Sequence, residues 1–297
     1  MLVFVTGATG FIGTAIVRDL IDAGHQVLGL TRTDAGAKSL IDAGAQVHRG
    51  DLEDMESLRS GAAMSDGVIH TAFNHDFSKF AANCEMDRRA IEALGSALAG
   101  SDRPLVVTSG TGLIAPGRIA TEDDVPASSS NSLPRVSEQT AASLAARGVR
   151  ASVVRLPQVH DRFKQGLVTY MIALAREKGI SAYVGNGLNR WPAVHRLDAA
   201  HLYKLVLEKG SAGSRYHAVA EEGVPLREVA DAIGRGLKAP VVAISPEEAA
   251  QHFGFLGFFV GVDGPASSAL TQERLGWRPT TQPGLIADLD RASAFEA

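Results

Sequence analysis

The stretch TGATGFIG, Thr6 to Gly13, places three glycines three residues apart directly after the apolar run 2–5. This spacing suits the binding of a dinucleotide pyrophosphate. One glycine permits a tight turn, one lets the backbone approach the anion, and one lets a new helix pack close to the strand. The residues predicted to bind the dinucleotide here are Gly7, Thr9, Gly10, Phe11, Ile12 and Gly13. The alternative is an ordinary glycine-rich turn between a strand and a helix.

A second candidate binding group follows the next expected strand, 26–30, at Thr31, Arg32 and Thr33. A carboxylate at this point would bind the ribose 2′-hydroxyl of NAD and repel a 2′-phosphate. The guanidinium of Arg32 instead suits a phosphate, to which the hydroxyls of Thr31 and Thr33 could add hydrogen bonds. We therefore expect NADP(H) to be preferred, with NAD(H) as the alternative if Arg32 is solvated and Asp34 turns inward.

The elements that must position these groups alternate between strand and helix. Apolar β-branched runs predict further strands at 67–72, 104–109 and 151–156. Helical stretches are expected at 14–22, 54–63, 81–99 and 135–146. Residues 40–47 nearly repeat residues 20–27, and each copy contains the end of a helix, a glycine and the start of the next strand. Alternation of this kind predicts an α/β fold with a parallel sheet covered on both faces. The loop 116–134 interrupts the alternation and is either a surface loop or a lid beside the site.

Composition restricts the class of protein. The 297 residues are enough for one large domain, or for a nucleotide domain with a smaller lobe, and the net charge of -4 gives no case for nucleic acid or a membrane surface as partner. The single cysteine, Cys84, excludes an intrachain disulfide and fits a reducing compartment. The N-terminal apolar run is too short for a signal peptide, and no stretch reaches membrane-spanning length. We expect a soluble cytoplasmic protein.

Several motifs along the chain occur in the order found in one enzyme family. They are TGATGFIG, Gly50-Asp51-Leu52, Val68-Ile69-His70-Thr71-Ala72, Val106-Val107-Thr108-Ser109-Gly110, Val153-Val154-Arg155-Leu156-Pro157, Val194-His195-Arg196-Leu197-Asp198 and Glu273-Arg274-Leu275-Gly276-Trp277-Arg278-Pro279. The chain thereby resembles the extended, partly atypical, short-chain dehydrogenase/reductases, including NAD-dependent epimerase/dehydratase-like proteins, over nearly its whole length.

The resemblance implies a Rossmann-type doubly wound parallel sheet with a smaller C-terminal substrate lobe. The dinucleotide domain would span 1–157 with a returning segment at about 190–220, and the smaller lobe would take 158–189 and 221–297. Further cofactor contacts implied by the motifs are Asp51, Leu52, Thr71, Ala72, Phe73 and Pro157. Asp51 would reach the adenine amino group, although an aspartate here could equally cap the next helix.

The chain departs from this family at the usual Tyr-x-x-x-Lys dyad. The matching stretch has proline at Pro134 and glutamate at Glu138, and no Tyr-x-x-x-Lys exists anywhere in the sequence. Ser109 and Thr111 could polarise a carbonyl oxygen, and Arg135 could stabilise its negative charge. Glu138 could accept hydrogen bonds from the ribose, act as an acid/base if burial raises its pKa, or be an exposed helix residue.

The histidines are the other candidate proton donors. His160 lies in the post-strand loop that the resemblance places near the nicotinamide, so it is the preferred general acid, with a packed loop histidine as the alternative. His75 is the weaker candidate, and His70 reads as a satisfied core residue. His195 and Asp198 fit a structural position at the join of the lobes. No two of these histidines have the spacing of metal ligands, so we expect no metal site.

Together these features favour an NADP(H)-dependent oxidoreductase that acts on a small, partly apolar carbonyl or alcohol substrate. The aromatic stretches 159–183 and 253–260 would form an apolar pocket wall, unless they are the core of the smaller lobe or a subunit contact. A non-catalytic redox sensor and an epimerase or dehydratase with transient cofactor use are the alternatives. The family often pairs through two long helices, here 81–99 and 135–146, so a homodimer also stays open.

Overall fold

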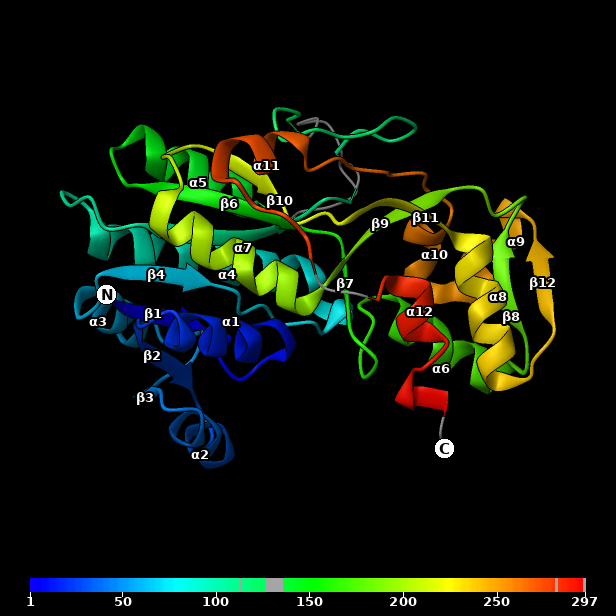
Figure 1. The fold of residues 1–297 in the computed structure, drawn as a ribbon, viewed down its shortest axis with the longest axis horizontal. Coiled ribbons are helices and arrows are strands. Elements are labelled where there is room, and N and C mark those ends of the chain that lie inside the picture. The colour runs from blue at the N-terminus through cyan, green and yellow to red at the C-terminus, as the bar shows by residue number, and fades with distance from the viewer. Residues whose placement is uncertain (113, 126–135, 281–282, 296–297) are drawn as a thin grey trace.

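The computed structural model describes residues 1–112, 114–125, 136–280 and 283–295, and it has two lobes joined by several chain crossings (Figure 1). The larger lobe contains a seven-stranded parallel sheet in the order β10-β6-β5-β4-β1-β2-β3. Its strands are β1 (Leu2–Thr6), β2 (Gln26–Thr31), β3 (Gln46–Arg49), β4 (Gly67–His70), β5 (Leu105–Gly110), β6 (Ala151–Leu156) and β10 (Arg215–His217). The predicted α/β class and Rossmann-type sheet are confirmed.

Helices cover both faces of this sheet because successive strand residues point to opposite sides. Val3 and Val5 of β1 pack in one apolar core, while Phe4 between them packs in another. The first core includes α1 (Phe11–Asp22) and α7 (Arg196–Lys209). The second includes α3 (Met55–Ala63), α4 (Phe80–Leu98) and α5 (Ser137–Ala146). Helix α2 (Asp34–Asp42) contacts β2 and β3 at the sheet edge, and the short η1 (Phe77–Lys79) precedes α4.

The smaller lobe contains two short sheets and its own apolar core. In the first sheet, β9 (Arg190–His195) pairs in parallel with β7 (Gln158–His160) and antiparallel with β11 (Glu221–Pro225). In the second, β8 (Ser181–Val184) pairs in parallel with β12 (Val241–Ile244). The remaining elements of this lobe are α6 (Val168–Lys178), α8 (Leu226–Leu237), α9 (Pro246–Phe253), η2 (Gly254–Leu256), α10 (Gly257–Val260), α12 (Leu285–Leu289) and η3 (Ser293–Phe295).

The chain crosses between the lobes more than once after β6. The segment 190–220, expected to return to the large lobe, contributes α7 and β10 there, whereas its first strand, β9, belongs to the smaller lobe. Helix α11 (Ala269–Leu275) contacts α7 and β10, and Trp277 is fully buried in the core of the large lobe. The stretch 269–277 falls in the range assigned to the smaller lobe from the sequence, yet it packs on the large sheet because Leu275 and Trp277 are buried there.

The described part of the loop 116–134 is held against the C-terminal chain. Ala120 forms an isolated parallel bridge with Ala266. Glu122 is buried and accepts two hydrogen bonds of 2.6 Å from the backbone and hydroxyl of Thr271. Residues 126–134 of this loop lie outside the described residues, so its role as a lid stays a prediction.

Candidate functional site

The glycine loop between β1 and α1 is shaped by contacts that leave no room for side chains. Gly7 has φ of +70°, a left-handed conformation that favours glycine, and its carbonyl accepts a 2.8 Å hydrogen bond from the Gly10 N–H. A Cβ at Gly13 would lie 1.9 Å from the Gly7 carbonyl oxygen. Helix α1 can therefore begin this close to the loop only with glycine at position 13.

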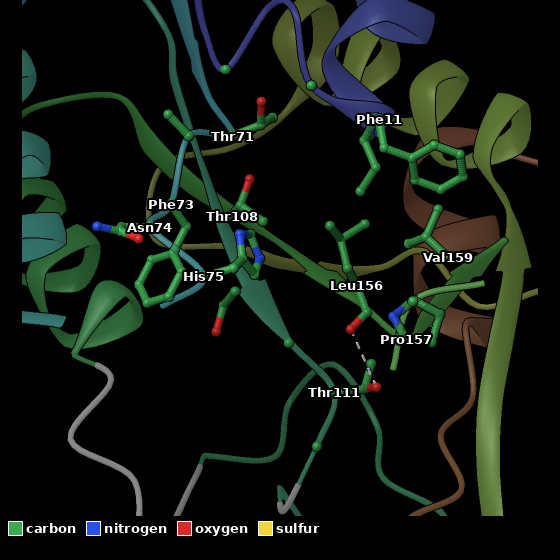
Figure 2. A pocket seen from close by; sticks show the side chains of 18 of the residues that line it. Phe11, Thr71, Phe73, Asn74, His75, Thr108, Thr111, Leu156, Pro157 and Val159 are labelled. Atoms are coloured by element: carbon green, nitrogen blue, oxygen red, sulfur yellow. Dashed lines mark hydrogen bonds between the residues drawn. The ribbon is translucent and has the colours of Figure 1, made fainter. Parts of the chain in front are cut away.

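A cavity of about 1250 Å³ extends from this loop into the space between the two lobes. The predicted cofactor residues that line it are Gly7, Gly10, Phe11, Ile12, Gly13, Thr31, Arg32, Asp51, Leu52, Thr71, Ala72, Phe73 and Pro157. Thr9 is exposed and is not among the lining residues. Of the predicted catalytic residues, Ser109, Thr111 and Glu138 line the same cavity. Figure 2 shows the side chains of Thr71 and Thr108 on one side of this space, Phe11 on the other, and Thr111 beside Leu156.

One end of the cavity, at the carboxyl ends of β2 and β3, is bordered by two arginines. Arg32 lines the main cavity and also an adjoining hollow of about 470 Å³, which Arg49 lines as well. The carboxylate of Asp34 does not turn inward: it is 98% exposed and lies 2.5 Å from the Arg49 guanidinium. The Thr33 hydroxyl accepts a hydrogen bond from the Gly36 N–H and caps α2. Asp34 therefore does not turn inward, as the alternative with NAD(H) required.

Asp51 lines the cavity without capping the next helix. Its Oδ1 accepts a 2.7 Å hydrogen bond from the backbone of Glu53, whereas Asp54 is the residue that caps α3 through the backbones of Glu56 and Ser57. The capping alternative for Asp51 is therefore wrong.

Beneath the glycine loop, a buried series of polar contacts connects β1, β4, α4 and α5. The Thr6 hydroxyl lies 2.7 Å from His70 Nδ1, and His70 Nε2 lies 3.1 Å from Asp87 of α4. Asp87 in turn accepts a 2.5 Å hydrogen bond from Ser137, the first residue of α5. The interpretation of His70 as a satisfied core residue is confirmed. The Thr71 hydroxyl donates to the Thr6 carbonyl and ties the loop after β4 to the glycine loop.

The two predicted carbonyl-polarising hydroxyls line the cavity but already have acceptors in the protein. Thr111 lies against the carbonyl of Leu156, which accepts from its backbone N–H at 3.0 Å and from its hydroxyl at 3.5 Å (Figure 2). Ser109 lies beside the carboxylate of Glu138 and helps to lower the pKa of that group. To bind a substrate oxygen, either hydroxyl would have to share or exchange its present partner.

Glu138 is neither an exposed helix residue nor a carboxyl group with a raised pKa. Arg155, which is fully buried, donates to both of its oxygens at 2.9 and 2.7 Å, and Arg215 lies 3.3 Å from one of them. Burial by itself would raise the pKa of Glu138, but the hydrogen bonds and charge of Arg155, with Ser109 and Arg215, outweigh it and lower the pKa. The acid/base interpretation, which required a raised pKa, is wrong, and Glu138 is a fixed carboxylate that can accept hydrogen bonds.

Arg155 is also the centre of a wider network. Its other guanidinium hydrogens reach Nε2 of His217 at 3.1 Å and the carbonyl of Asp124 at 2.8 Å. Burial lowers the pKa of His217, so its ring is neutral and accepts the hydrogen bond from Arg155. This network could not be predicted from the sequence because its members lie on β6, β10, α5 and the 121–124 segment, which are distant in sequence.

His160 does not reach the cavity. It is 1% exposed, its Nδ1 lies 2.7 Å from Asp288, and its ring packs edge-on against His195. It is therefore the packed loop histidine of the alternative interpretation, and its assignment as general acid is not supported by its position. Burial lowers the pKa of His195, which caps α7, in keeping with the structural role expected for it.

Several cavity residues come from the smaller lobe, some from the stretches predicted as a pocket wall and others from outside them. They are Lys164, Leu167, Tyr170, Trp191, Pro192, Phe259 and Val262. The aromatic stretches predicted as a pocket wall contribute Tyr170 and Phe259, whereas Phe253, Leu256 and Val260 are buried in the lobe core. Both predicted roles of these stretches thus occur, divided between different side chains.

Three further expectations concern Arg135, a metal site and membrane-spanning segments. Arg135 lies outside the described residues. Within the described ranges, no group of three or more histidine, cysteine or carboxylate side chains is arranged to hold a metal ion. The helices in those ranges include none with both the length and the apolar character needed to span a bilayer.

The decisive comparison is with a family model. The model described as the NAD dependent epimerase/dehydratase family matches residues 3–220. The chain belongs to this family. That span includes the glycine loop, all of the large sheet except Leu2, and the Glu138–Arg155 pair.

Relatives of this family member differ in how closely they match. An uncharacterized protein of Schizosaccharomyces pombe is 52% identical over 99% of this chain and 100% of its own length. A sterol-4-alpha-carboxylate 3-dehydrogenase (decarboxylating) of Dictyostelium discoideum is 26% identical over 76% of this chain and 73% of its own. The crystal structure of a dTDP-glucose 4,6-dehydratase of Streptomyces venezuelae with NAD and TYD bound has a TM-score of 0.77 at 20% identity, covering 99% and 96% of the two chains. This structural likeness shows the fold.

Proposed function

We propose that this family member is an NADP(H)-dependent oxidoreductase acting on a small, partly apolar carbonyl or alcohol substrate. The observation that carries the proposal is that one cavity joins the glycine loop and Arg32 at one end to aromatic side chains of the smaller lobe at the other. A site of this shape suits a long cofactor that meets an apolar substrate between the lobes.

The residues present fit the dinucleotide. Gly7 and Gly13 leave a cradle that side chains would fill, and α1 points its N-terminus at that cradle. Arg32, with Arg49 beside the same hollow, supports a 2′-phosphate. The carboxylate of Asp34 is exposed and paired with Arg49, and the carboxylates that line the hollow are those of Asp51, Glu53 and Asp54. When bound, a reduced nicotinamide would supply a hydride, which is two electrons and one proton, to a carbonyl carbon.

The residues of the chain would hold and orient these partners. The ionised Glu138 accepts hydrogen bonds and so suits ribose hydroxyls, replacing the donor that a lysine would be. Phe73 and Phe80, which pack edge to face at 6.1 Å, together with Trp191 and Phe259, offer an apolar surface to the substrate. Closure of this surface around an apolar carbonyl would also exclude water from the reacting atoms.

The cofactor preference is tested by Arg32→Ala with Arg59→Ala as the matched control, since Arg59 is an exposed α3 residue outside the cavity. Charged hydrogen bonds contribute about 1.5–3 kcal/mol. We therefore expect NADPH to bind roughly tenfold to a hundredfold more weakly to the Arg32 variant, with NADH affinity little changed. Fluorescence titration measures both affinities. An equal loss of affinity for NADPH and NADH would contradict the assignment of Arg32 as the residue that binds the 2′-phosphate.

Turnover is tested by following NADPH absorbance with benzaldehyde, cinnamaldehyde and 2-octanone. Consumption of NADPH supports the reductase. Tight binding of NADPH without its consumption favours a redox sensor. Glu138, which is paired with Arg155 and replaces the dyad lysine, would suit such a protein. A nicotinamide that stays bound through purification without net consumption favours an epimerase or dehydratase.

A further inference from the structure

The reductase proposed above needs a proton donor, and few side chains of the described cavity lining can supply one. Glu138 is held as a carboxylate by two guanidinium groups. Asp51 and Glu53 line the end of the cavity bordered by Arg32, which is the proposed adenine end. The donors that remain near the apolar end are His75, Lys164 and Tyr170. Of these types, histidine is the one that exchanges protons near neutral pH without a special environment.

The tyrosines do not provide the missing dyad residue. Tyr203 is buried, and its hydroxyl shares a 2.7 Å hydrogen bond with Thr108 beneath the site. Tyr216 is buried and accepts from the Ser211 backbone. Tyr170 lines the cavity from α6 and packs edge-on against Phe255, so it belongs to the wall of the smaller lobe.

Lys164 is drawn toward a different part of the cavity. Its ammonium lies 5.8 Å from the centre of the Phe11 ring, at the start of α1. It is thus directed toward the helix that follows the glycine loop. A cation there suits the cofactor more than the substrate carbonyl.

His75 lies where the loop after β4 meets the carboxyl end of β5. These strands are neighbours, with His70 paired to Val107, so the loop 71–76 adjoins Ser109 and Thr111. The ring packs edge-on against Phe73 at 5.4 Å. Figure 2 shows it directed into the pocket near Thr108, opposite Leu156.

The loop that carries His75 is held by its own hydrogen bonds. Asn74 accepts from the backbone of Asp76, and Asp76 accepts from the backbone and hydroxyl of Ser78. His75 is exposed, so water can restore its proton after each turnover. The backbone of the loop is thus held by hydrogen bonds, while the His75 side chain lines the cavity and is exposed to solvent.

We propose that His75 is the catalytic acid that replaces the family tyrosine, an inference that rests on the proposed reductase function. The imidazolium of His75 would give one proton to the substrate oxygen. The carbonyl carbon would gain a hydride from the bound reduced dinucleotide, so that a C–H bond forms and the C=O π pair moves onto the oxygen. The carbonyl becomes an alcohol, the dinucleotide is oxidised, and the neutral ring regains its proton from water. In alcohol oxidation the neutral ring accepts the proton.

The test compares His75→Gln with two variants. His201→Gln is the matched control, because His201 is a half-exposed α7 residue beside Asp19 and outside the cavity. Tyr170→Phe removes the rival hydroxyl. We expect His75→Gln to lower kcat for the aldehyde panel by roughly a hundredfold or more with unchanged NADPH affinity, as befits a lost acid/base group.

The pH dependence separates a proton donor from a merely structural residue. The charged side chains that line the same cavity are those of Arg32, Asp51, Glu53, Glu138, Lys164 and Arg215, and Asp76 is the chain neighbour of the ring. Wild-type reduction should slow as the pH rises and the ring loses its proton, and His75→Gln should lose that limb of the profile. Retention of the limb in His75→Gln, or its loss in Tyr170→Phe instead, would overturn the assignment.

A second readout needs no turnover. The ring resonance of His75 in a proton NMR spectrum is identified by its absence from His75→Gln. NADPH should shift it, whereas 2′,5′-ADP, which lacks the nicotinamide, should not. An unmoved resonance in the presence of bound NADPH overturns the role of His75 alone, and failure of NADPH to bind overturns the proposed function itself.

Discussion

The carboxylate of Glu138 occupies the position at which the resemblance leads one to expect a lysine, and its neighbours determine what it can do. Two arginines face it, and one of them, Arg155, is completely buried. Because the two opposite charges compensate each other inside the protein, neither can be removed alone without leaving a buried charge. The sequence indicated the substitution itself, but it could not indicate the partner, which lies 17 residues away on the central sheet.

Glu138→Gln should therefore destabilise the protein. At neutral pH we expect the free energy of unfolding to fall by about 3 kcal/mol, because Arg155 loses its counter-charge. Glu56→Gln is the control, since Glu56 is 82% exposed and pairs with a surface arginine, and its effect should stay within about 0.5 kcal/mol. Urea denaturation measures both.

The difference in the free energy of unfolding between the wild type and Glu138→Gln should change with pH in a definite direction. The pKa of Glu138 is lowered below its ordinary 4.5 by Arg155 against the effect of burial, so the unfolded chain binds more protons in the range between the two values. The stabilisation is complete above pH 4.5 and is lost as the pH falls below it. A wild-type advantage that grew on acidification would contradict this account.

At the scale of elements, the sequence predicted the sheet well and the short strands of the smaller lobe poorly. The apolar runs and glycine stops around β1, β2, β5 and β6 are local signals, and the structure has strands within a residue or two of the expected bounds. Strand β9 pairs with β7 and β11, which are about thirty residues away on either side, and no local pattern encodes that pairing.

The junction of β1 and α1 gives a test at this scale. Gly13→Ala should weaken NADPH binding and lower the free energy of unfolding by about 1–3 kcal/mol, because the new methyl group would collide with the Gly7 carbonyl. Gly261→Ala is the matched control, since a Cβ there meets nothing within 4 Å. Equal effects of the two substitutions in denaturation and cofactor titration would argue against the close approach.

At the scale of the whole molecule, the C-terminal chain joins the lobes. After leaving the smaller lobe it packs α11 and Trp277 on the large sheet and then returns to place α12 against α8 (Figure 1). The same scale explains why the sequence did not indicate the buried position of His160, whose partner Asp288 lies 128 residues further along the chain. Cofactor residues could be predicted because they lie in short motifs, whereas contacts between distant segments could not.

Trp277→Ala tests this connection. The side chain is fully buried and its indole N–H donates to the Asp198 carbonyl, so its removal should lower the free energy of unfolding by about 3–5 kcal/mol. Phe163→Ala, at a 58% exposed aromatic residue, should cost far less. Loss of only the smaller lobe in the Trp277 variant, with the large lobe intact by circular dichroism and limited proteolysis, would contradict the assignment.

The buried Arg155 also bears on how such a site could change over evolutionary time. A single replacement of Glu138 by lysine would place three cations together, Arg155, Arg215 and the new ammonium, with no carboxylate between them. A lysine at position 138 is therefore electrostatically unfavourable while both arginines are in place. A variant designed to carry the family tyrosine and lysine would therefore need changes at Arg155 and Arg215 as well as at Glu138.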